Sequence, residues 1–343
     1  FSNTFNAIQF LYGENLEPAN KRVVTLERGY LPIIHYSVTD GDLVYRLEAF
    51  SAPEDFNPGN NLVSHIRWEV TNEGQERSTG QLGLALKQGA LHNLYCTPWW
   101  RDRFMDVEQY EQNTELNFVN GQVTKGQHLV LTYPGNGMQQ LPAEVDAPGR
   151  LFWPVNLEAG ESKTFTFSFP FVPIQLEKQD QVRYLEQSDY ALLKKQLVDF
   201  WENELASIAT FSVPEKKVQD AFRASYINML VARDVLEDGV RLTQRDSEFQ
   251  YDYSYVRSAA YFVRLYNMLG KPDIARQIAN HFFIRDTEGR LMEFRSRLGI
   301  HNKFVGDYWG QVLWGIGNHI RHTGDKELLD MVFSGQGYGK GWS

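Results

Sequence analysis

The sequence contains a single cysteine, Cys96, among its 343 residues. One thiol excludes an internal disulfide and any zinc site built from several cysteines. This suits a cytoplasmic protein, but exported bacterial proteins also lack disulfides, so both compartments stay open. The chain starts at Phe1, with no charged segment followed by an apolar one. We therefore expect that a leader has been removed or that the sequence begins inside a longer protein.

Long apolar runs and basic clusters are also missing. No stretch of about 18 apolar residues occurs, which excludes a membrane-spanning helix. The 34 Lys and Arg residues are outnumbered by 43 Asp and Glu, giving a net charge of −9. A nucleic-acid partner is therefore not expected, because binding to phosphates needs clustered Lys and Arg.

Several catalytic motifs are absent as well. There is no His-Glu-x-x-His, no Gly-x-Ser-x-Gly, and no Gly-x-Gly-x-x-Gly between a strand and a helix. The histidines of the first half occur singly, without the spacing of metal ligands, and we expect them to be structural: His35, His65, His92 and His128. The sequence thus predicts neither a metal nor a cofactor.

Aromatic residues, in contrast, are abundant. They make up 14% of the chain, with 8 Trp, 17 Tyr and 22 Phe. Large cores account for part of this content. Sugar binding would account for the rest, because aromatic faces stack on the apolar C–H faces of a sugar ring.

The first half has the pattern of short strands. Residues 44–50, 65–70 and 164–169 alternate between apolar and polar side chains, with turn residues between such segments. Asn120-Gly121 predicts a two-residue hairpin, because both residue types tolerate positive φ. We predict that residues 1–180 form a large β-sandwich.

The pattern becomes helical after this point. Residues 181–212 predict a linker helix, and residues 213–343 predict helical hairpins. A helix starting at 212–214 would have Pro214 near its first turn, and two more are predicted over 255–269 and 307–322. Gly270 and Gly324 are suited to end helices, and their spacing of about 54 residues indicates an αα-hairpin repeat. Only the first part of such a helical domain fits in the chain.

The helix predicted over 307–322 contains three glycines: Gly310, Gly315 and Gly317. Each costs about 1 kcal/mol relative to alanine in a helix. We expect this helix to pack with its backbone close to other helices, as in the inner ring of a helical barrel.

One stretch combines the chemistry of a carbohydrate site. Asp252, Tyr253, Tyr255, Arg257 and Ser258 cluster at the start of the helix predicted over 255–269. The rings can stack on a sugar while the carboxylate and the guanidinium hydrogen-bond its hydroxyls. The alternative for Arg257 is a buried salt bridge.

Glycoside hydrolysis needs two carboxyl groups, one acting as acid and the other as base or nucleophile. The candidates near this stretch are Asp246, Glu248, Asp252, Glu293 and Asp307. Asp307 is the best placed, beside Tyr308 and Trp309 at the start of the glycine-rich helix. The alternative is that Asp307 only caps that helix.

Residues 253–258 and 306–314 give the chain a family resemblance. It resembles the six-hairpin glycosidase group, which includes glucoamylases, trehalase-like enzymes, and maltose and kojibiose phosphorylases. The 253–258 stretch is similar to the aromatic-x-aromatic-x-Arg-Asp segment of glucoamylases, with Ser258 in place of the aspartate. The resemblance implies a β-sandwich joined by a linker helix to an (α/α)6 barrel, here incomplete.

The resemblance also implies a function. Arg257 matches the arginine that holds the non-reducing-end sugar, while Ser258 weakens glucoamylase-like specificity. The residues expected to bind substrate are Tyr253, Tyr255, Arg257, Ser258, Asp307 and Trp309. The group's acid and base would lie beyond Ser343, so the catalytic residues stay unknown, with Asp307 and Asp252 as weak candidates.

We therefore expect a glycoside hydrolase that acts on α-linked oligosaccharides with inversion and without a metal. The alternatives are an inverting disaccharide phosphorylase and a non-catalytic carbohydrate-binding relative. An incomplete helical domain would expose an apolar edge, so self-association is a further expectation.

Overall fold

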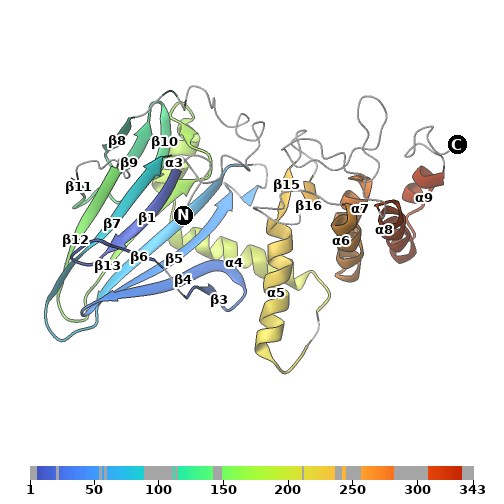
Figure 1. Cartoon of the computed structure of the whole chain (residues 1–343), viewed down its shortest axis with the longest axis horizontal. Coiled ribbons are helices and arrows are strands. Elements are labelled where there is room, and N and C mark those ends of the chain that lie inside the picture. The colour runs from blue at the N-terminus through green and yellow to red at the C-terminus, as the bar shows by residue number, and fades with distance from the viewer. Residues whose placement is uncertain are drawn as a thin grey trace. The chain divides into compact units, whose positions relative to one another are not determined.

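The computed structural model describes most of the chain in two compact units, Phe1–Asp199 and Phe200–Ser343 (Figure 1). The described residues are 6–20, 23–53, 56–57, 60–88, 110, 112, 115–141, 149–210, 212–235, 242–244, 256–281 and 308–333.

The first unit contains two antiparallel sheets. The five-stranded sheet has the order β11-β12-β7-β1-β2. Its strands are β1 (Asn6–Tyr12), β2 (Glu17–Pro18), β7 (Ser78–Gln88), β11 (Gln139–Leu141) and β12 (Gly149–Leu157).

The nine-stranded sheet has the order β3-β4-β5-β6-β13-β10-β9-β8, and β14 pairs with β10. Its strands are β3 (Thr25–Glu27), β4 (Leu31–Asp40), β5 (Leu43–Pro53), β6 (Leu62–Asn72), β8 (Leu116–Val119), β9 (Gln122–Lys125), β10 (His128–Thr132), β13 (Ser162–Pro170) and β14 (Ile174–Gln175).

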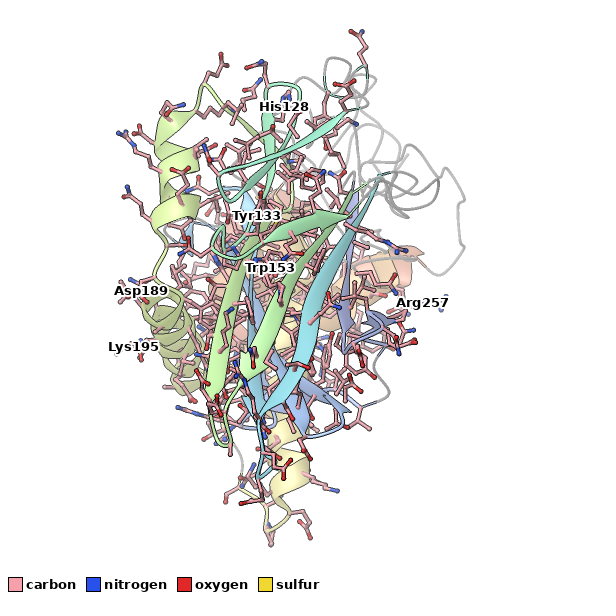
Figure 2. All side chains as sticks on the ribbon, turned by 90° about the vertical axis from the view of Figure 1, so that its left-hand side faces the viewer. His128, Tyr133, Trp153, Asp189, Lys195 and Arg257 are labelled. Atoms are coloured by element: carbon pink, nitrogen blue, oxygen red, sulfur yellow. The ribbon has the colours of Figure 1, made fainter. Side chains whose placement is uncertain are left out.

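The two sheets share one hydrophobic core. Phe10 of β1 contacts Trp68 of β6 and Phe167 of β13, with ring centroids 5.4 and 5.1 Å apart. Trp153 of β12 lies 5.2 Å from Phe167, and Figure 2 shows it close to Tyr133. Large antiparallel sheets with a shared core are compatible with the predicted β-sandwich.

The hairpin predicted at Asn120-Gly121 is confirmed. Val119 pairs with Gln122, so the loop between β8 and β9 has two residues. Both loop residues have positive φ, 52° for Asn120 and 82° for Gly121. This backbone geometry is the reason for Asn and Gly at these two positions.

The segment 181–212, for which a linker helix was predicted, contains two helices: α3 (Gln179–Gln187) and α4 (Tyr190–Ala206). The Asp189 carboxylate accepts hydrogen bonds from the N–H groups of Ala191 and Leu192, at 2.9 and 3.1 Å. This is the geometry of an N-cap, so Asp189 starts a new helix. Val182 and Leu185 of α3 pack on Val63 and Leu129 of the nine-stranded sheet.

The second unit contains five further helices and a short hairpin among its described residues. The elements are α5 (Lys216–Val231), β15 (Arg233–Val235), β16 (Leu242–Gln244), α6 (Val256–Met268), α7 (Pro272–His281), α8 (Tyr308–Thr323) and α9 (Lys326–Phe333). The β15–β16 hairpin was not predicted. The helix expected to start at 212–214 begins at Lys216, so Pro214 precedes its first turn.

The two predicted helix ends are confirmed, since Gly270 and Gly324 have φ of 80° and 71°. They close α6 and α8, and α7 and α9 follow directly. Helix α6 packs against both α7 and α8. The described helices thus form neighbouring pairs, while a closed ring is not visible in them.

The close packing expected at the glycines of α8 is not seen for two of them among the described residues. A Cβ added at Gly310 or Gly317 meets no described atom within 4 Å. Gly315 is buried. No described helix is both long and apolar enough to cross a bilayer.

Candidate functional site

Most residues of the predicted carbohydrate site lie outside the described residues. These are Asp252, Tyr253, Tyr255 and Asp307, together with the further carboxylate candidates Asp246, Glu248 and Glu293. Trp309 is the second residue of α8, but its side chain is not described. The two remaining members, Arg257 and Ser258, lie in the first turn of α6. The side chain of Arg257 is exposed and that of Ser258 is half-buried.

The helix that begins with these residues carries an aromatic contact to α8. The rings of Tyr261 and Trp314 are 5.1 Å apart between centroids and tilted by 59°. The guanidinium carbon of Arg264 lies 5.6 Å from the Trp314 ring centre, which is a cation–π distance. We name Tyr261, Arg264 and Trp314 the aromatic face.

Arg257 shares a helix side with this face. Residues 257, 261 and 264 are four and three positions apart, which aligns them along one side of α6. Tyr261 is 56% exposed although it is a large aromatic residue. Gly310 and Gly317 lie about one turn before and after Trp314 on α8, and a Cβ at either would meet no described atom within 4 Å.

The aromatic face joins the two stretches that carry the family resemblance. Residues 256–258 of the first stretch begin α6, and residues 308–314 of the second form the first half of α8. The sequence did not predict the pairing of Tyr261 with Trp314, because the packing of α6 on α8 is not a local property. An exposed ring such as Tyr261 can stack on a sugar, and the neighbouring guanidinium groups can donate hydrogen bonds to it.

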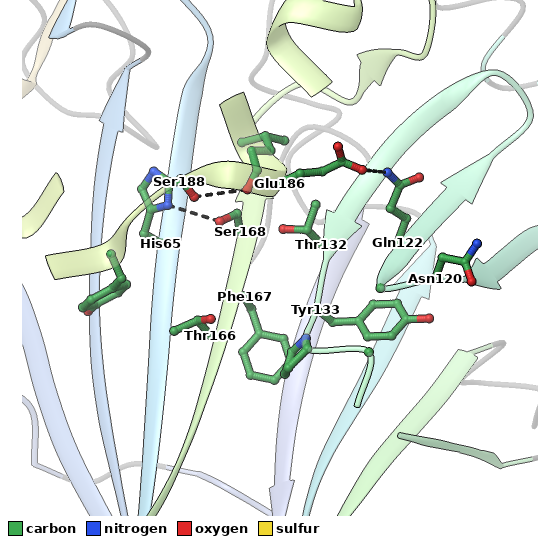
Figure 3. A pocket seen from close by; sticks show the side chains of 15 residues that line it. His65, Asn120, Gln122, Thr132, Tyr133, Thr166, Phe167, Ser168, Glu186 and Ser188 are labelled. Carbon is green, nitrogen blue, oxygen red and sulfur yellow. Dashed lines mark hydrogen bonds between the residues drawn. The ribbon is translucent and has the colours of Figure 1, made fainter. Parts of the chain in front are cut away.

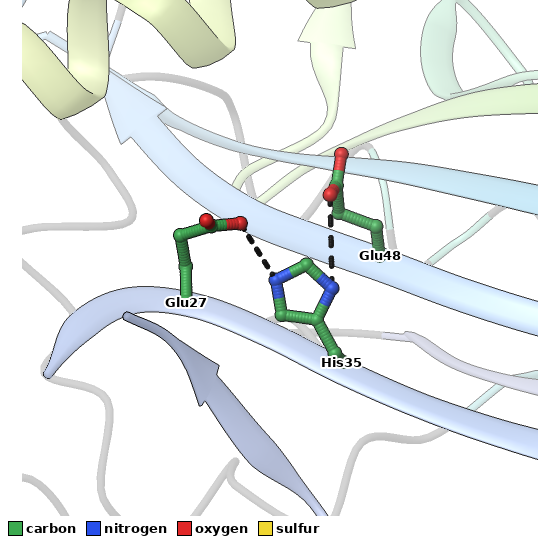
Figure 4. Close-up of side chains that lie close together, drawn as sticks. All are labelled: Glu27, His35 and Glu48. Carbon is green, nitrogen blue, oxygen red and sulfur yellow. Dashed lines mark hydrogen bonds and ion pairs between the residues drawn. The ribbon is translucent and has the colours of Figure 1, made fainter. Parts of the chain in front are cut away.

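A second polar cluster lies in the first unit, where Glu27, His35 and Glu48 come together (Figure 4). Each side chain offers one possible ligand atom, and these atoms lie within 4.8 Å of one another. His35 Nε2 is 3.0 Å from Glu27 Oε2, and His35 Nδ1 is 3.6 Å from Glu48 Oε2. Sequence spacing did not predict this grouping, because the three residues belong to three strands.

Two side-chain cations already balance these carboxylates. Lys194 Nζ of α4 lies 2.7 Å from Glu48 Oε2 and 3.1 Å from Glu27 Oε2. Arg67 of β6 lies 3.2 Å from the other oxygen of Glu48. A metal ion between the carboxylates would compete with the Lys194 ammonium, so the geometry is that of a charge network. We name these five residues the Lys194 network.

The pKa values of two members follow from these contacts. Partial burial acts to raise the pKa of Glu27, but the hydrogen bond and charge of Lys194, aided by His35, hold it below its usual value. Burial acts to lower the pKa of Lys194, but its hydrogen bonds to Glu48 and Glu27 raise it. Both groups are therefore charged at neutral pH.

Comparisons with known proteins give similarity in structure only. No family model and no curated sequence matches the chain. A solved structure named "Putative kojibiose phosphorylase from human microbiome" is similar over 94% of this chain, with a TM-score of 0.53 and 12% identity. A family GH92 alpha-mannosidase from Bacteroides thetaiotaomicron matches over 87% of the chain, with a TM-score of 0.30 and 10% identity.

The lengths of these proteins differ from that of the chain. This chain spans 46% of the length of the first structure and 42% of the length of the second. At such identities a similar structure establishes a shared fold and leaves the activity open. The chain therefore has the fold of roughly half of the first of these proteins.

Proposed function

We propose that the chain is part of a glycoside hydrolase that acts on α-linked glucosides or oligosaccharides with inversion. The observation that supports this most is the aromatic face, on which an exposed tyrosine, a tryptophan and an arginine meet beside Arg257. In this proposal α6 and α8 are inner helices of an (α/α)6 barrel, and α7 and α9 are outer ones.

In this proposal, the residues that bind the sugar are different from the residues that cleave the glycosidic bond. Tyr261 and Trp314 stack on the sugar, and Arg257 donates hydrogen bonds to its hydroxyls. The sequence-predicted partners Tyr253, Tyr255, Ser258, Asp307 and Trp309 extend this site.

Inversion requires a protonated acid and a basic carboxylate about 6.5–9.5 Å apart, with a water between base and sugar. Asp252 and Asp307 are the weak candidates that the sequence offers for these roles.

A second candidate is an inverting disaccharide phosphorylase of the same architecture. The observation in its favour is the structural similarity to the protein named as a kojibiose phosphorylase. In such an enzyme inorganic phosphate replaces water as the nucleophile. A third candidate is a non-catalytic carbohydrate-binding relative, which Ser258 favours because it replaces an acidic sugar ligand.

Incubation of the whole protein, including the acid and base expected beyond Ser343, with a panel of α-linked glucose disaccharides, with and without inorganic phosphate, separates these functions. Release of free glucose alone supports hydrolysis, and phosphate-dependent release of glucose 1-phosphate supports phosphorolysis. Saturable binding without turnover supports the non-catalytic alternative.

Isothermal titration calorimetry with the same sugars tests the binding surface itself. Tyr261→Ala and Trp314→Ala should weaken binding. Phe333→Ala, which removes another exposed aromatic ring in the second unit, should leave it unchanged. Equal affinity in all three variants would remove the aromatic face from the proposal.

A further inference from the structure

The first unit contains a cavity that the proposed function does not use. It has a volume of about 350 Å³ and lies beside the nine-stranded sheet (Figure 3). Thr166 and Ser168 of β13 line it, whereas Phe165 and Phe169 of the same strand belong to the core. Leu185 and Ser188, at the α3–α4 junction, also line it. We name this space the sheet cavity.

A row of polar side chains crosses the sheet at this level. His65 of β6 pairs with Ser168 of β13, Ser168 pairs with Thr132 of β10, and Thr132 pairs with Gln122 of β9. All four residues line the sheet cavity. Paired strands lie about 4.7–4.9 Å apart, so the row presents successive hydrogen-bonding groups at a regular spacing.

His65 gives this row an unsatisfied polar atom. The residue is 1% exposed, and its Nδ1 lies 3.2 Å from Ser168 Oγ. Its Nε2 is buried and has no hydrogen-bond partner among the described residues. Burial lowers the pKa of His65 to about 4, so the ring is neutral at physiological pH. A buried polar atom without a partner is unfavourable, and no described group offsets this cost at His65 Nε2.

The charge of the lining restricts the class of ligand. Among the described lining residues there is no Lys or Arg, and the one carboxylate is that of Glu186. The Gln122 amide donates a hydrogen bond to this carboxylate. Such a lining offers hydroxyls, amides and a carboxylate, but no cation that would favour a phosphate or another anion.

The size of the sheet cavity restricts the ligand further. A volume of about 350 Å³ is at the lower end of the range for small-molecule sites. We propose that the sheet cavity binds a neutral polyhydroxylated molecule of monosaccharide size. The hydroxyls of Thr132 and Thr166 then exchange hydrogen bonds with those of the ligand, and His65 lies behind them, bonded to Ser168. This site is separate from the aromatic face and does not rest on the proposed function.

Calorimetric titration of the intact chain with D-glucose tests the proposal. The double substitution Thr132→Val and Thr166→Val removes two lining hydroxyls with little change in shape and should weaken binding about tenfold. Thr164→Val is the matched control. Thr164 is exposed on the same strand and does not line the cavity, so affinity should be unchanged. Equal melting temperatures verify that the variants are folded.

A second measurement needs no substitution in the sheet cavity. Glucose should shift the imidazole nitrogen resonances of His65 in NMR spectra, and Tyr261→Ala should leave this shift in place. Failure of the proposed function alone would abolish sugar turnover but keep the His65 shift. The proposal is overturned by absent saturable binding, by equal affinity in the double variant, or by an unchanged His65 signal. Tighter binding of inorganic phosphate than of glucose would also overturn it.

Discussion

The Lys194 ammonium lies 2.7 Å from the Glu48 carboxylate, although 146 residues separate them in the sequence. Glu48 is 8% exposed and belongs to β5, while Lys194 belongs to α4. The same ammonium contacts Glu27, and Arg67 contacts Glu48. This network fixes the first turns of α4 to the edge of the nine-stranded sheet.

Lys194→Met is expected to lower the free energy of unfolding by about 1–3 kcal/mol, because two nearby carboxylates lose their shared cation. Chemical denaturation measures this change. Lys195→Met is the control, since Lys195 is 72% exposed and, among the described residues, pairs only with the exposed Asp199 on the same helix. We expect an effect below about 0.5 kcal/mol there.

A double-mutant cycle with Glu48→Gln checks the coupling in this network. Additive losses would contradict it.

The pKa shifts of Glu27 and Lys194 predict how the network depends on pH. Glu27 has a lowered pKa, so it stabilises the fold at pH values above its usual pKa of 4.5, and this contribution is lost as the pH falls through its pKa in the folded state. Lys194, with its raised pKa, contributes below its usual value of 10.5 and ceases to contribute as the pH rises through the folded value.

His65 should make stability depend on pH in mildly acidic solution. Burial lowers its pKa from 6.5 to about 4, so the unfolded state binds a proton more readily over this window. The contribution of neutral His65 to the free energy of unfolding is therefore complete above pH 6.5. It declines as the pH falls toward 4, by at most about 1.4 kcal/mol per pH unit. His65→Gln should flatten this part of the stability profile measured by urea unfolding. An unchanged slope would show that His65 is not buried as a neutral ring.

Gly121 is expected to tolerate alanine less well than Gly137. Both have positive φ, at 82° and 73°, so both substitutions strain the backbone. A Cβ at Gly121 would also lie 2.9 Å from the backbone oxygen of Tyr133, whereas one at Gly137 meets no described atom within 4 Å. Gly121→Ala should therefore cost about 1–3 kcal/mol more in unfolding free energy than Gly137→Ala. Equal losses would show that the hairpin moves away from Tyr133 without penalty.

Asp325 should be important for the start of α9. Its Oδ1 accepts a hydrogen bond from the Leu328 N–H at 2.8 Å, and its Oδ2 lies 2.7 Å from Arg276 Nε and 3.4 Å from His319 Nε2. Asp325→Ala should lower the unfolding free energy by about 1–3 kcal/mol, because it removes a cap and an ion pair together. Asp330→Ala, at an exposed position on α9, serves as the control.

Asp325→Asn separates the two contributions, because the amide can still cap the helix. Burial acts to raise the pKa of Asp325, but the Leu328 N–H, Arg276 and His319 lower it. Its contribution is present above its usual value of 3.8 and lost as the pH falls. The asparagine variant should therefore lose less stability than alanine, and its loss should vanish in acid. A loss equal to that of alanine at all pH values would contradict the capping role.

Features that depend on residues close together in the sequence were predictable. Asn120-Gly121 specified its hairpin, and Gly270 and Gly324 specified helix ends, because positive φ is a property of the residue itself. The alternation over 44–50 and 65–70 specified strands that lie within β5 and β6. The break between α3 and α4 was missed, although Asp189 is a residue type that favours N-caps.

Features that depend on which strands or helices lie side by side in the fold were not predictable, because these elements are far apart in the sequence. Alternation shows which face of a strand is buried, but not which strand lies beside it. The pairing of His65 with Ser168, 103 residues apart, therefore had no local signal. The contact of Tyr261 with Trp314 likewise depends on how α6 packs against α8.

The polar row across the nine-stranded sheet is assembled from residues that are synthesised at different times. Its members enter the growing polypeptide in the order His65, Gln122, Thr132 and Ser168, and the covering Ser188 follows them. During synthesis on the ribosome, more than a hundred further residues are added after His65 before its hydrogen-bond partner Ser168 is made. Nascent chains that stop before Ser188 therefore lack residues that line this pocket, and the proposed ligand could bind only after the chain has been translated beyond α3.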